Sequence, residues 1–389
     1  MLKKIIFSVL LITSFDQNTI YSMEINLKSN IKLNEISFFE KIIIPTPSKA
    51  TKVHAISGIS FENNIIFAYY ANYPSEKSNI HMQNICISRG TINDSNTITW
   101  ISPSIAATPF EISNKFYNSE NKCFDPVLFL FKNIIYLFYK VGTHPRNWFG
   151  FVKISYDYGE SWTKPIPLPE GILGPTKCKP LIAQNDNDLI CGSSTQKENF
   201  KVENNKQGDG WISINILKDF GKLEILEINN SKNWELIDNV TYGNPGSVII
   251  QPAIWQYNTN IYMLCRSNNG KLVYTNSNDY GKTWSNSIDS ELPSNYSAID
   301  ILSTETEIFM AWNPINNNFR NKLILSKLIN PLAPEKLSSW EEIFVIESDD
   351  QNPKTEYSFP SIIFQNNKLI VAYGVNQKEM RLAIIDFKT

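Results

Sequence analysis

The sequence predicts an all-β protein with the architecture of a six-bladed β-propeller. Short apolar runs rich in Ile, Val, Tyr and Phe recur along the chain, whereas helical periodicity is scarce. Clusters of Asn, Asp, Gly and Pro separate these runs, a pattern typical of many short antiparallel strands. One turn pattern, S-x-D-x-G-x-[ST]-W, occurs at residues 155–162 and again at 277–284, which indicates a chain built from repeated units.

Each residue type in this turn pattern has a local physical role. The carboxylates of Asp157 and Asp279 can accept hydrogen bonds from the turn backbone, and the glycine permits a positive φ. The Ser or Thr adds a hydroxyl-to-backbone bond, and the Trp supplies a large apolar side chain beside the turn. The pattern therefore predicts a locked hairpin turn at the end of a strand.

Weaker copies of the pattern set the number of blades. Ser88, Ser213 and Ser326 follow or end apolar runs, and the intervals between successive copies are roughly 50 to 67 residues. Such an interval accommodates one four-stranded blade, and the chain after its first 22 residues accommodates six. The clearest predicted strands are residues 65–70, 127–130, 134–139, 261–265, 308–312, 323–328 and 369–373. A large sandwich or a β-helix fits the spacing less well.

The predicted last blade closes near the C-terminus, with strands at residues 369–373 and 382–387. The most polar stretch, residues 195–210, is predicted to be a long loop on one blade. Nothing in the composition divides the chain, so residues 23–389 are expected to form a single domain.

The composition limits the possible partners. The 389 residues are 42% hydrophobic, which is sufficient for a sizeable core, and the formal net charge is −2. No strong field exists to attract nucleic acid or an anionic membrane, so an anionic ligand must be held by a few placed cations.

The N-terminus has the features of a secretory signal. Lys3 and Lys4 precede an apolar run at residues 5–15, and Ser22 is a candidate cleavage point. Residues 1–22 are therefore predicted to be a signal peptide, with a buried first strand as the alternative. No later segment is long and apolar enough to span a bilayer, so the expected location is secreted or periplasmic.

The cysteines and histidines give no sign of a cofactor. The five cysteines lie in or near apolar runs and are expected to be buried thiols, although a Cys178–Cys191 bridge stays open. His54, His81 and His144 lack metal-ligand spacing. Neither a metal nor another cofactor is predicted.

The repeated turn resembles the Asp-box of sialidases and of predicted bacterial neuraminidases with BNR repeats. Further resembling blocks follow in order from about residue 44 to the C-terminus: His54-Ala55, residues 125–129, 171–180, 250–252, 264–267 and 356–360. The resemblance implies a sialidase-like propeller and an exo-α-sialidase type of glycoside hydrolase acting on a glycan or glycoconjugate. It also implies that Asp157 and Asp279 are structural, because Asp-boxes lie away from the active site of sialidases.

The resemblance further implies a set of site residues. A sialic acid carries a carboxylate that the planar fork of arginine is suited to hold, and a tyrosine nucleophile avoids repulsion from that carboxylate. Arg266 and Arg320 resemble the second and third of the three arginines of sialidases. Tyr357 resembles the nucleophile, with Gln251 or Glu356 orienting it.

The chain departs from the sialidase pattern at three places. Gln251 stands where sialidases carry a glutamate, and the step at residues 43–45 lacks the first arginine. His54 or Lys179 could supply part of the missing cation, although a structural role for His54 is an equal alternative. The third departure is that the acid of the early loop has no clear match.

Glu76 is the candidate for that acid, because a glutamate with a raised pKa can protonate a leaving oxygen. The alternative is a solvated loop carboxylate. Trp148, Trp211 and Trp255 could stack on sugar rings, but packing between blades is the commoner use of a propeller tryptophan. Two other functions stay open: a catalytically inactive glycan-binding propeller, and a glycosidase for a different sugar.

Overall fold

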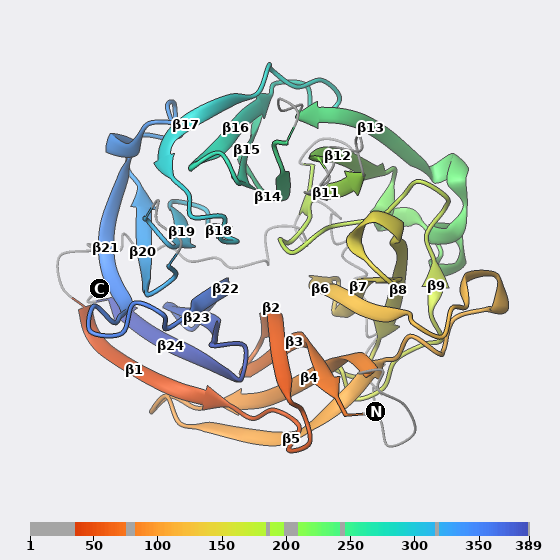
Figure 1. Cartoon of the computed structure of the whole chain (residues 1–389), viewed down its shortest axis with the longest axis horizontal. Helices are drawn as coiled ribbons and strands as arrows, with labels where there is room; N and C mark the ends of the chain where they lie inside the picture. The colour runs from red at the N-terminus through yellow and green to blue at the C-terminus, as the bar shows by residue number, and fades with distance from the viewer. Residues whose placement is uncertain are drawn as a thin grey trace, which may run out of the picture.

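The computed structural model describes residues 36–74, 82–183, 187–197, 209–241, 246–315 and 319–387. Across these residues, twenty-four strands form six antiparallel four-stranded sheets around a common axis (Figure 1). This arrangement confirms the predicted six-bladed β-propeller.

The strands of each blade follow chain order from the axis outwards. The first five blades are β2 (Lys52–Phe61), β3 (Asn64–Tyr73), β4 (Met82–Ile92) and β5 (Ile98–Ala107); β6 (Lys122–Phe131), β7 (Ile134–Gly142), β8 (Phe149–Ser155) and β9 (Ile166–Pro167); β10 (Leu181–Ile182), β11 (Leu189–Lys197), β12 (Asp209–Leu217) and β13 (Trp234–Thr241); β14 (Ile249–Tyr257), β15 (Asn260–Ser267), β16 (Lys271–Ser277) and β17 (Ile288–Pro293); and β18 (Asp300–Ser303), β19 (Ile308–Trp312), β20 (Lys322–Leu328) and β21 (Trp340–Ser348). Short 3-10 helices lie in the connections: η3 (Asn114–Phe116), η4 (Pro145–Asn147), η5 (Phe220–Lys222), η6 (Ile225–Asn229), η7 (Ser231–Asn233) and η8 (Leu337–Ser339).

The sixth blade joins the two ends of the described chain. It contains β22 (Tyr357–Gln365), β23 (Lys368–Val375) and β24 (Glu379–Phe387), and its outermost strand is β1 (Ile36–Ile44). The red β1 lies antiparallel to the blue β24 in Figure 1, with Ile44 opposite Met380. The predicted closure by residues 369–373 and 382–387 is confirmed, whereas the contribution of β1 was not predicted.

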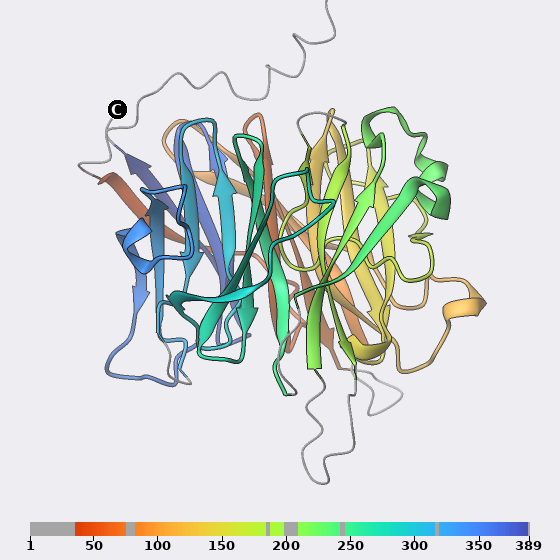
Figure 2. The same cartoon turned by 90° about the horizontal axis from the view of Figure 1, so that it is seen from above.

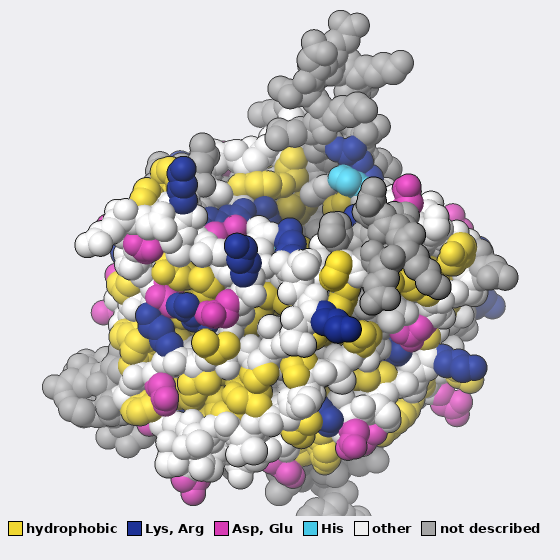
Figure 3. Space-filling view, turned by 60° about the horizontal axis from the view of Figure 1, so that its bottom comes forward, with side chains coloured by type: hydrophobic (Ala, Val, Ile, Leu, Met, Phe, Trp, Pro, Cys, Tyr) yellow, Lys and Arg dark blue, Asp and Glu magenta, His cyan; other side chains and the backbone are white. Residues whose placement is uncertain are grey.

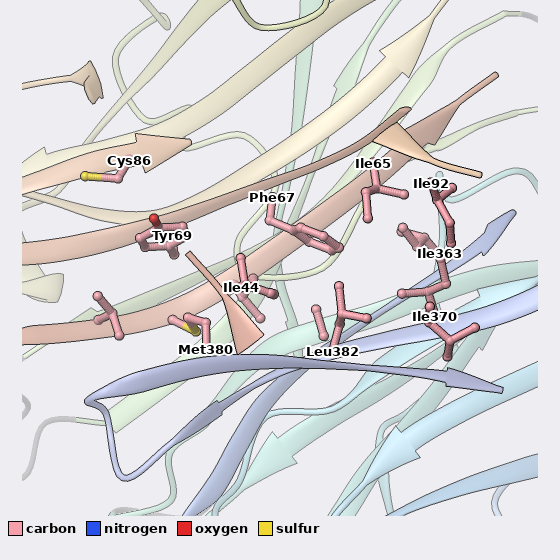
Figure 4. Close-up of a cluster of buried hydrophobic side chains, with 14 of the residues drawn as sticks. Ile44, Ile65, Phe67, Tyr69, Cys86, Ile92, Ile363, Ile370, Met380 and Leu382 are labelled. Atoms are coloured by element: carbon pink, nitrogen blue, oxygen red, sulfur yellow. The ribbon is translucent and has the colours of Figure 1, made fainter. Parts of the chain in front are cut away.

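The core contains six large buried clusters, one between each pair of successive blades, and a small seventh cluster of Ala55, Ala298 and Phe359. Figure 4 shows the cluster between blades 6 and 1, where Ile44 and Leu382 meet Phe67 and Tyr69. Successive side chains of a strand point to opposite faces of its sheet, so each blade contributes to the clusters on both sides. Figure 2 shows the propeller from the side, with the blades arranged next to one another around the central axis.

The Asp-centred turns have the predicted geometry. Asp157 Oδ1 accepts hydrogen bonds from the Ser155 hydroxyl and from the Ser161 backbone N–H, both at 2.8 Å, while Gly159 has a φ of 80°. Asp279 makes the same contacts after β16. Burial is the largest single influence on the pKa of Asp157 and raises it, but hydrogen bonds from Ser161 and Ser155 together outweigh burial and lower the pKa. The copies at 88, 213 and 326 lie in β4, β12 and β20, each the third strand of its blade.

Three other predictions meet different outcomes. The loop predicted at residues 195–210 is shorter, because β11 continues to Lys197 and β12 begins at Asp209, paired opposite it. All five cysteines are buried free thiols, so the Cys178–Cys191 bridge is not formed. The predicted signal peptide lies outside the described residues, within which no helix is long and apolar enough to cross a membrane.

Candidate functional site

A left-handed backbone residue stands near the axis in every blade. The six are Ala55 (φ 58°), Asp125 (φ 38°), Lys177 (φ 70°), Gln251 (φ 53°), Tyr296 (φ 58°) and Phe359 (φ 54°). Those in β2, β6, β14 and β22 coincide with register shifts, and the other two lie just before β10 and β18. A bulge redirects a side chain, and non-glycine residues in this conformation carry strain that surrounding structure must hold. These six residues, four of them at bulges, therefore mark the centre of the propeller as a candidate site.

A chain of hydrogen bonds crosses this centre from blade 2 to blade 4. Gln251 Nε2 donates to Asp125 Oδ2 at 3.2 Å, and Gln251 Oε1 accepts from Arg266 Nη1 at 2.8 Å. All three side chains are buried. Gln251 thus orients the guanidinium of Arg266, as a neutral amide that both accepts and donates.

Arg266 lies on an aromatic surface. Its guanidinium carbon is 4.0 Å from the ring centre of Tyr296 and 5.7 Å from that of Phe359. Burial lowers the pKa of Arg266 to about 10, which leaves it charged at neutral pH. Its Nε is buried and has no acceptor among the described residues. A held cation with an uncommitted donor is suited to bind an anion.

Arg320 joins the same site through Tyr296. Arg320 Nη2 donates to the carbonyl oxygen of Tyr296 at 2.7 Å, and Nη1 pairs with Glu356 Oε1 at 2.9 Å. Burial opposes the charge of Glu356, but the Ser358 hydroxyl, the charge of Arg320 and the Gln377 amide outweigh it and lower the pKa of Glu356. The structure therefore brings together Arg266, Arg320, Gln251 and Glu356, with Gln251 and Glu356 contacting the arginines.

His54 is in the site but as a neutral ring. Its ring centre lies 4.1 Å from that of Phe359 and 5.6 Å from that of Tyr70. Burial is the largest influence and lowers the pKa of His54 to about 3, despite the opposing charge of Glu356. The suggestion that His54 supplies part of the missing positive charge is therefore not supported.

Lys179 forms an ion pair and a hydrogen bond with residues of blades 5 and 6. Its Nζ lies 3.2 Å from Asp300 Oδ2 and donates to the carbonyl oxygen of Ile362 at 2.9 Å. These contacts tie the segment before β10 to blades 5 and 6. The lysines whose charges act on Asp125 are instead Lys140 and Lys177, both buried. Because Lys179 makes these contacts, the suggestion that it supplies part of the missing cation is not supported.

Tyr357 does not share the site of the arginines. Its ring packs in the cluster between blades 5 and 6, with its centre 6.4 Å from that of Tyr373. Burial, together with the charges of Glu347 and Asp349, raises the pKa of Tyr357. The bulge of β22 brings Phe359, two residues further on, to the centre instead. The sequence order of the residues does not reveal this bulge, so the assignment of Tyr357 was wrong.

Tyr70 is a site residue that sequence reasoning missed. It lies in β3 opposite His54, and its hydroxyl makes no hydrogen bond within the described residues. Burial is the main cause that raises the pKa of Tyr70, and the charges of Asp125 and Glu356 add to it. Both carboxylates are therefore close enough to act on this hydroxyl.

Asp125 was also missed as a site residue. Burial raises the pKa of Asp125, although Lys140, Gln251, Lys177 and Arg266 oppose the shift. An aspartate before a proline at the head of an apolar strand was the available signal, since such a carboxylate is buried next to an irregular backbone. Glu76, the predicted acid, lies outside the described residues.

The described residues contain no group of three or more His, Cys, Asp or Glu side chains that could hold a metal ion. Charged side chains of both signs are interspersed with small apolar areas over the face in Figure 3, in keeping with the small net charge.

The blades and the Asp-centred turns define a sialidase-like propeller. The chain belongs to the BNR repeat-like domain family, which matches residues 82–371. A protein of unknown function from Dyadobacter fermentans is similar in structure, with a TM-score of 0.64 and 13% identity over 90% of this chain and 98% of that one. The search of curated proteins gives no match.

Solved sialidases share the fold at similarly low identity. The NanB sialidase from Streptococcus pneumoniae has a TM-score of 0.59 and 13% identity over 95% of this chain and 72% of that one. The Trypanosoma rangeli sialidase in complex with sialic acid has a TM-score of 0.57 and 14% identity over 90% and 58% of the two chains. These likenesses establish the fold.

Proposed function

We propose that the chain binds the terminal acidic sugar of a glycan at the centre of the propeller, with Arg266 and Arg320 holding the sugar carboxylate. The observation that carries this proposal is the placement of both arginines on Tyr296, one on its ring and one on its carbonyl. Two preset guanidinium groups recognise a planar carboxylate through directed, charge-assisted hydrogen bonds. The sialidase-like fold supports the same choice of ligand.

Calorimetric titration tests this proposal with the α-methyl glycoside of N-acetylneuraminic acid and with its methyl ester. The acid is expected to bind, and the ester is expected to bind at least about tenfold more weakly because it lacks the charge. Arg266→Met should lose a similar factor for the acid. Arg89→Met, in the outer half of blade 1, is the control and should bind as the wild type does. Equal affinity for acid and ester would refute the clamp.

Hydrolysis of the glycosidic bond is the second candidate function, and Tyr70 favours it. Its hydroxyl, which has no hydrogen bond within the described residues, is influenced by two carboxylates whose pKa values move in opposite directions, upward for Asp125 and downward for Glu356. Such a pair separates a proton donor from a proton acceptor. In this scheme Glu356 takes the proton of Tyr70, whose oxygen bonds to the anomeric carbon. Asp125 protonates the departing oxygen. Asp125 then takes a proton from a water molecule that attacks the anomeric carbon, and the Tyr70 oxygen leaves and recovers its proton from Glu356.

A fluorogenic sialoside tests the hydrolase directly. The wild type should release the fluorophore, Tyr70→Phe should lose at least about a hundredfold in kcat/KM, and Tyr357→Phe should match the wild type. If the wild type binds the sugar but cleaves neither this substrate nor a panel of other glycosides, the chain is a binding propeller. Cleavage of a different glycoside would identify a glycosidase for another sugar.

The predicted signal at residues 1–22 leads us to propose a secreted or periplasmic location. Expression of the full chain in a bacterial host, followed by N-terminal sequencing of the exported product, tests it. An unprocessed cytoplasmic product would contradict the proposal.

A further inference from the structure

Five aromatic rings form a continuous arc that begins at Arg266. The distances between successive ring centres are 4.1 Å from Phe359 to His54, 5.6 Å to Tyr70, 6.4 Å to Phe124 and 5.3 Å to Trp148. The arc therefore crosses from blade 6 over blade 1 to blade 2. Trp148 follows η4, between β7 and β8.

The outer two rings of the arc are not part of the core. Phe124 and Trp148 are only partly buried, and neither belongs to any of the seven buried clusters or to the side chains packed against them. In contrast, Trp255 is 2% exposed and packs between blades 4 and 5. Trp211 is also buried, and its Nε1 donates to Asp238 at 2.9 Å. Of the three tryptophans predicted as stacking candidates, Trp148 is the one beside the site.

The chemistry of the arc indicates an uncharged ligand. At neutral pH none of its five rings carries a charge, because burial keeps His54 neutral. An aromatic face binds the C–H side of a pyranose ring, while the hydroxyl rim of the sugar stays in water. A second acidic sugar would need a cation in the arc itself, which these rings do not provide.

We propose that Phe124 and Trp148 form a stacking platform for the neutral sugar next to the terminal acidic sugar. The position of the ligand rests on the proposed function, since a sugar acid held by Arg266 would place its neighbouring residue along the arc. Phe359 contacts the guanidinium at one end, and Trp148 lies four rings away at the other. The platform would make the protein prefer oligosaccharides over the free monosaccharide.

The test compares three ligands: N-acetylneuraminyl-lactose, the α-methyl sialoside, and lactose. For the wild type, the lactose extension should strengthen binding about fivefold over the methyl sialoside, and lactose alone should give weak chemical-shift changes. Trp148→Ala should lose both effects and keep the affinity for the methyl sialoside. Trp148→Phe should restore part of the gain.

Phe149→Ala is the matched control. Phe149 is the next residue, is 45% exposed and packs against Phe116 with ring centres 5.0 Å apart, on the other side of the strand. This variant should retain the gain from lactose. Thermal unfolding of each variant checks that the fold is intact.

The outcomes separate the two proposals. No gain from the lactose extension in the wild type overturns the platform, and so does a gain that Trp148→Ala retains. If acidic sugars do not bind but lactose binds to the wild type and not to Trp148→Ala, the acidic-sugar proposal fails and the platform stands. If none of the three ligands binds, both proposals fail.

Discussion

The Asp-centred turns and the left-handed central positions are both repeated around the propeller. The turns repeat a set of side chains, whereas the central positions repeat a backbone conformation. The turns after β8 and β16 repeat the same side chains, and their contacts run between residues two to four positions apart. The central positions repeat a left-handed backbone conformation, four of them at bulges, and carry six different residue types. A repeated side-chain pattern therefore serves the fold, whereas a repeated backbone with diverging side chains presents varied chemistry at one place.

The two regions also depend differently on the complete ring. Gln251 and Asp125 are 126 positions apart, and Arg320 and Glu356 are 36 apart. Such contacts form only once the blades are assembled, because each one closes a long loop of chain. The turns form within one hairpin. Substitutions should thus have different consequences in the two regions.

The largest effect is expected at Gln251. Gln251→Ala leaves the buried Asp125 and Arg266 without their bridging amide, and should lower the free energy of unfolding by about 3 kcal/mol. Urea unfolding measures this change. Gln256→Ala is the control: Gln256 is half-buried near the end of β14, and its substitution should change this free energy by less than about 0.5 kcal/mol. Equal losses at the two glutamines would remove the central network as a source of stability.

A smaller effect is expected at the turns. Asp279→Ala removes the bonds from Ser277 and Thr283 at an exposed turn, and should cost about 1–2 kcal/mol. The affinity for an acidic sugar should be unchanged, because the turn lies away from the arginines. Asp289→Ala, an exposed aspartate in β17, should alter neither quantity. A loss of sugar binding in Asp279→Ala would contradict the claim that this turn contributes to the fold and not to the binding site.

The two regions should affect stability in different pH ranges, and His54 determines the range for the propeller centre. The folded-state pKa of His54 is about 3 and its ordinary value is 6.5, so the unfolded chain binds the extra proton between these values. Stability should therefore fall as the pH drops from 6.5 towards 3. Glu356, Arg266, Arg320 and Lys52 are the charged groups that act on this ring.

His54→Gln should reduce the dependence of Tm on pH within that window, while the exposed His144→Gln should not. Asp157 and Asp279 have lowered pKa values, so their contribution is present above about pH 4 and is lost only at lower pH. Thermal unfolding between pH 3 and 7 measures both effects. An unchanged slope in His54→Gln would show that the ring is not held neutral.

The smallest effect is expected at Tyr357. Tyr357→Phe removes a hydroxyl that has no hydrogen bond within the described residues, and should change the free energy of unfolding by less than about 0.5 kcal/mol. Sugar affinity should also be unchanged. Titration and urea unfolding of this variant check both values, and a large loss of affinity would return Tyr357 to the site.

Features that depend on residues close together in the sequence were predicted correctly, whereas features that depend on contacts between distant residues were not. Strands, turns and blade number could be predicted because alternation, turn residues and repeat spacing are local properties. The shared location of Arg266 and Arg320 also followed, since the repeat assigns each to a strand or loop at the same end of its blade. The roles assigned to Tyr357, His54 and Lys179 failed, because each depended on where a side chain points near the axis.

The sequence by itself determined the six blades, the Asp-centred turns and three of the charged residues of the site, Arg266, Arg320 and Glu356. The tertiary structure decided that Phe359 rather than Tyr357 reaches the centre, that His54 is neutral there, and that Tyr70 and Asp125 join the arginines. The physical reason is that one bulged residue shifts the register of a strand and changes which side chains face the axis. Local patterns do not record such a shift, which is maintained by contacts between distant blades.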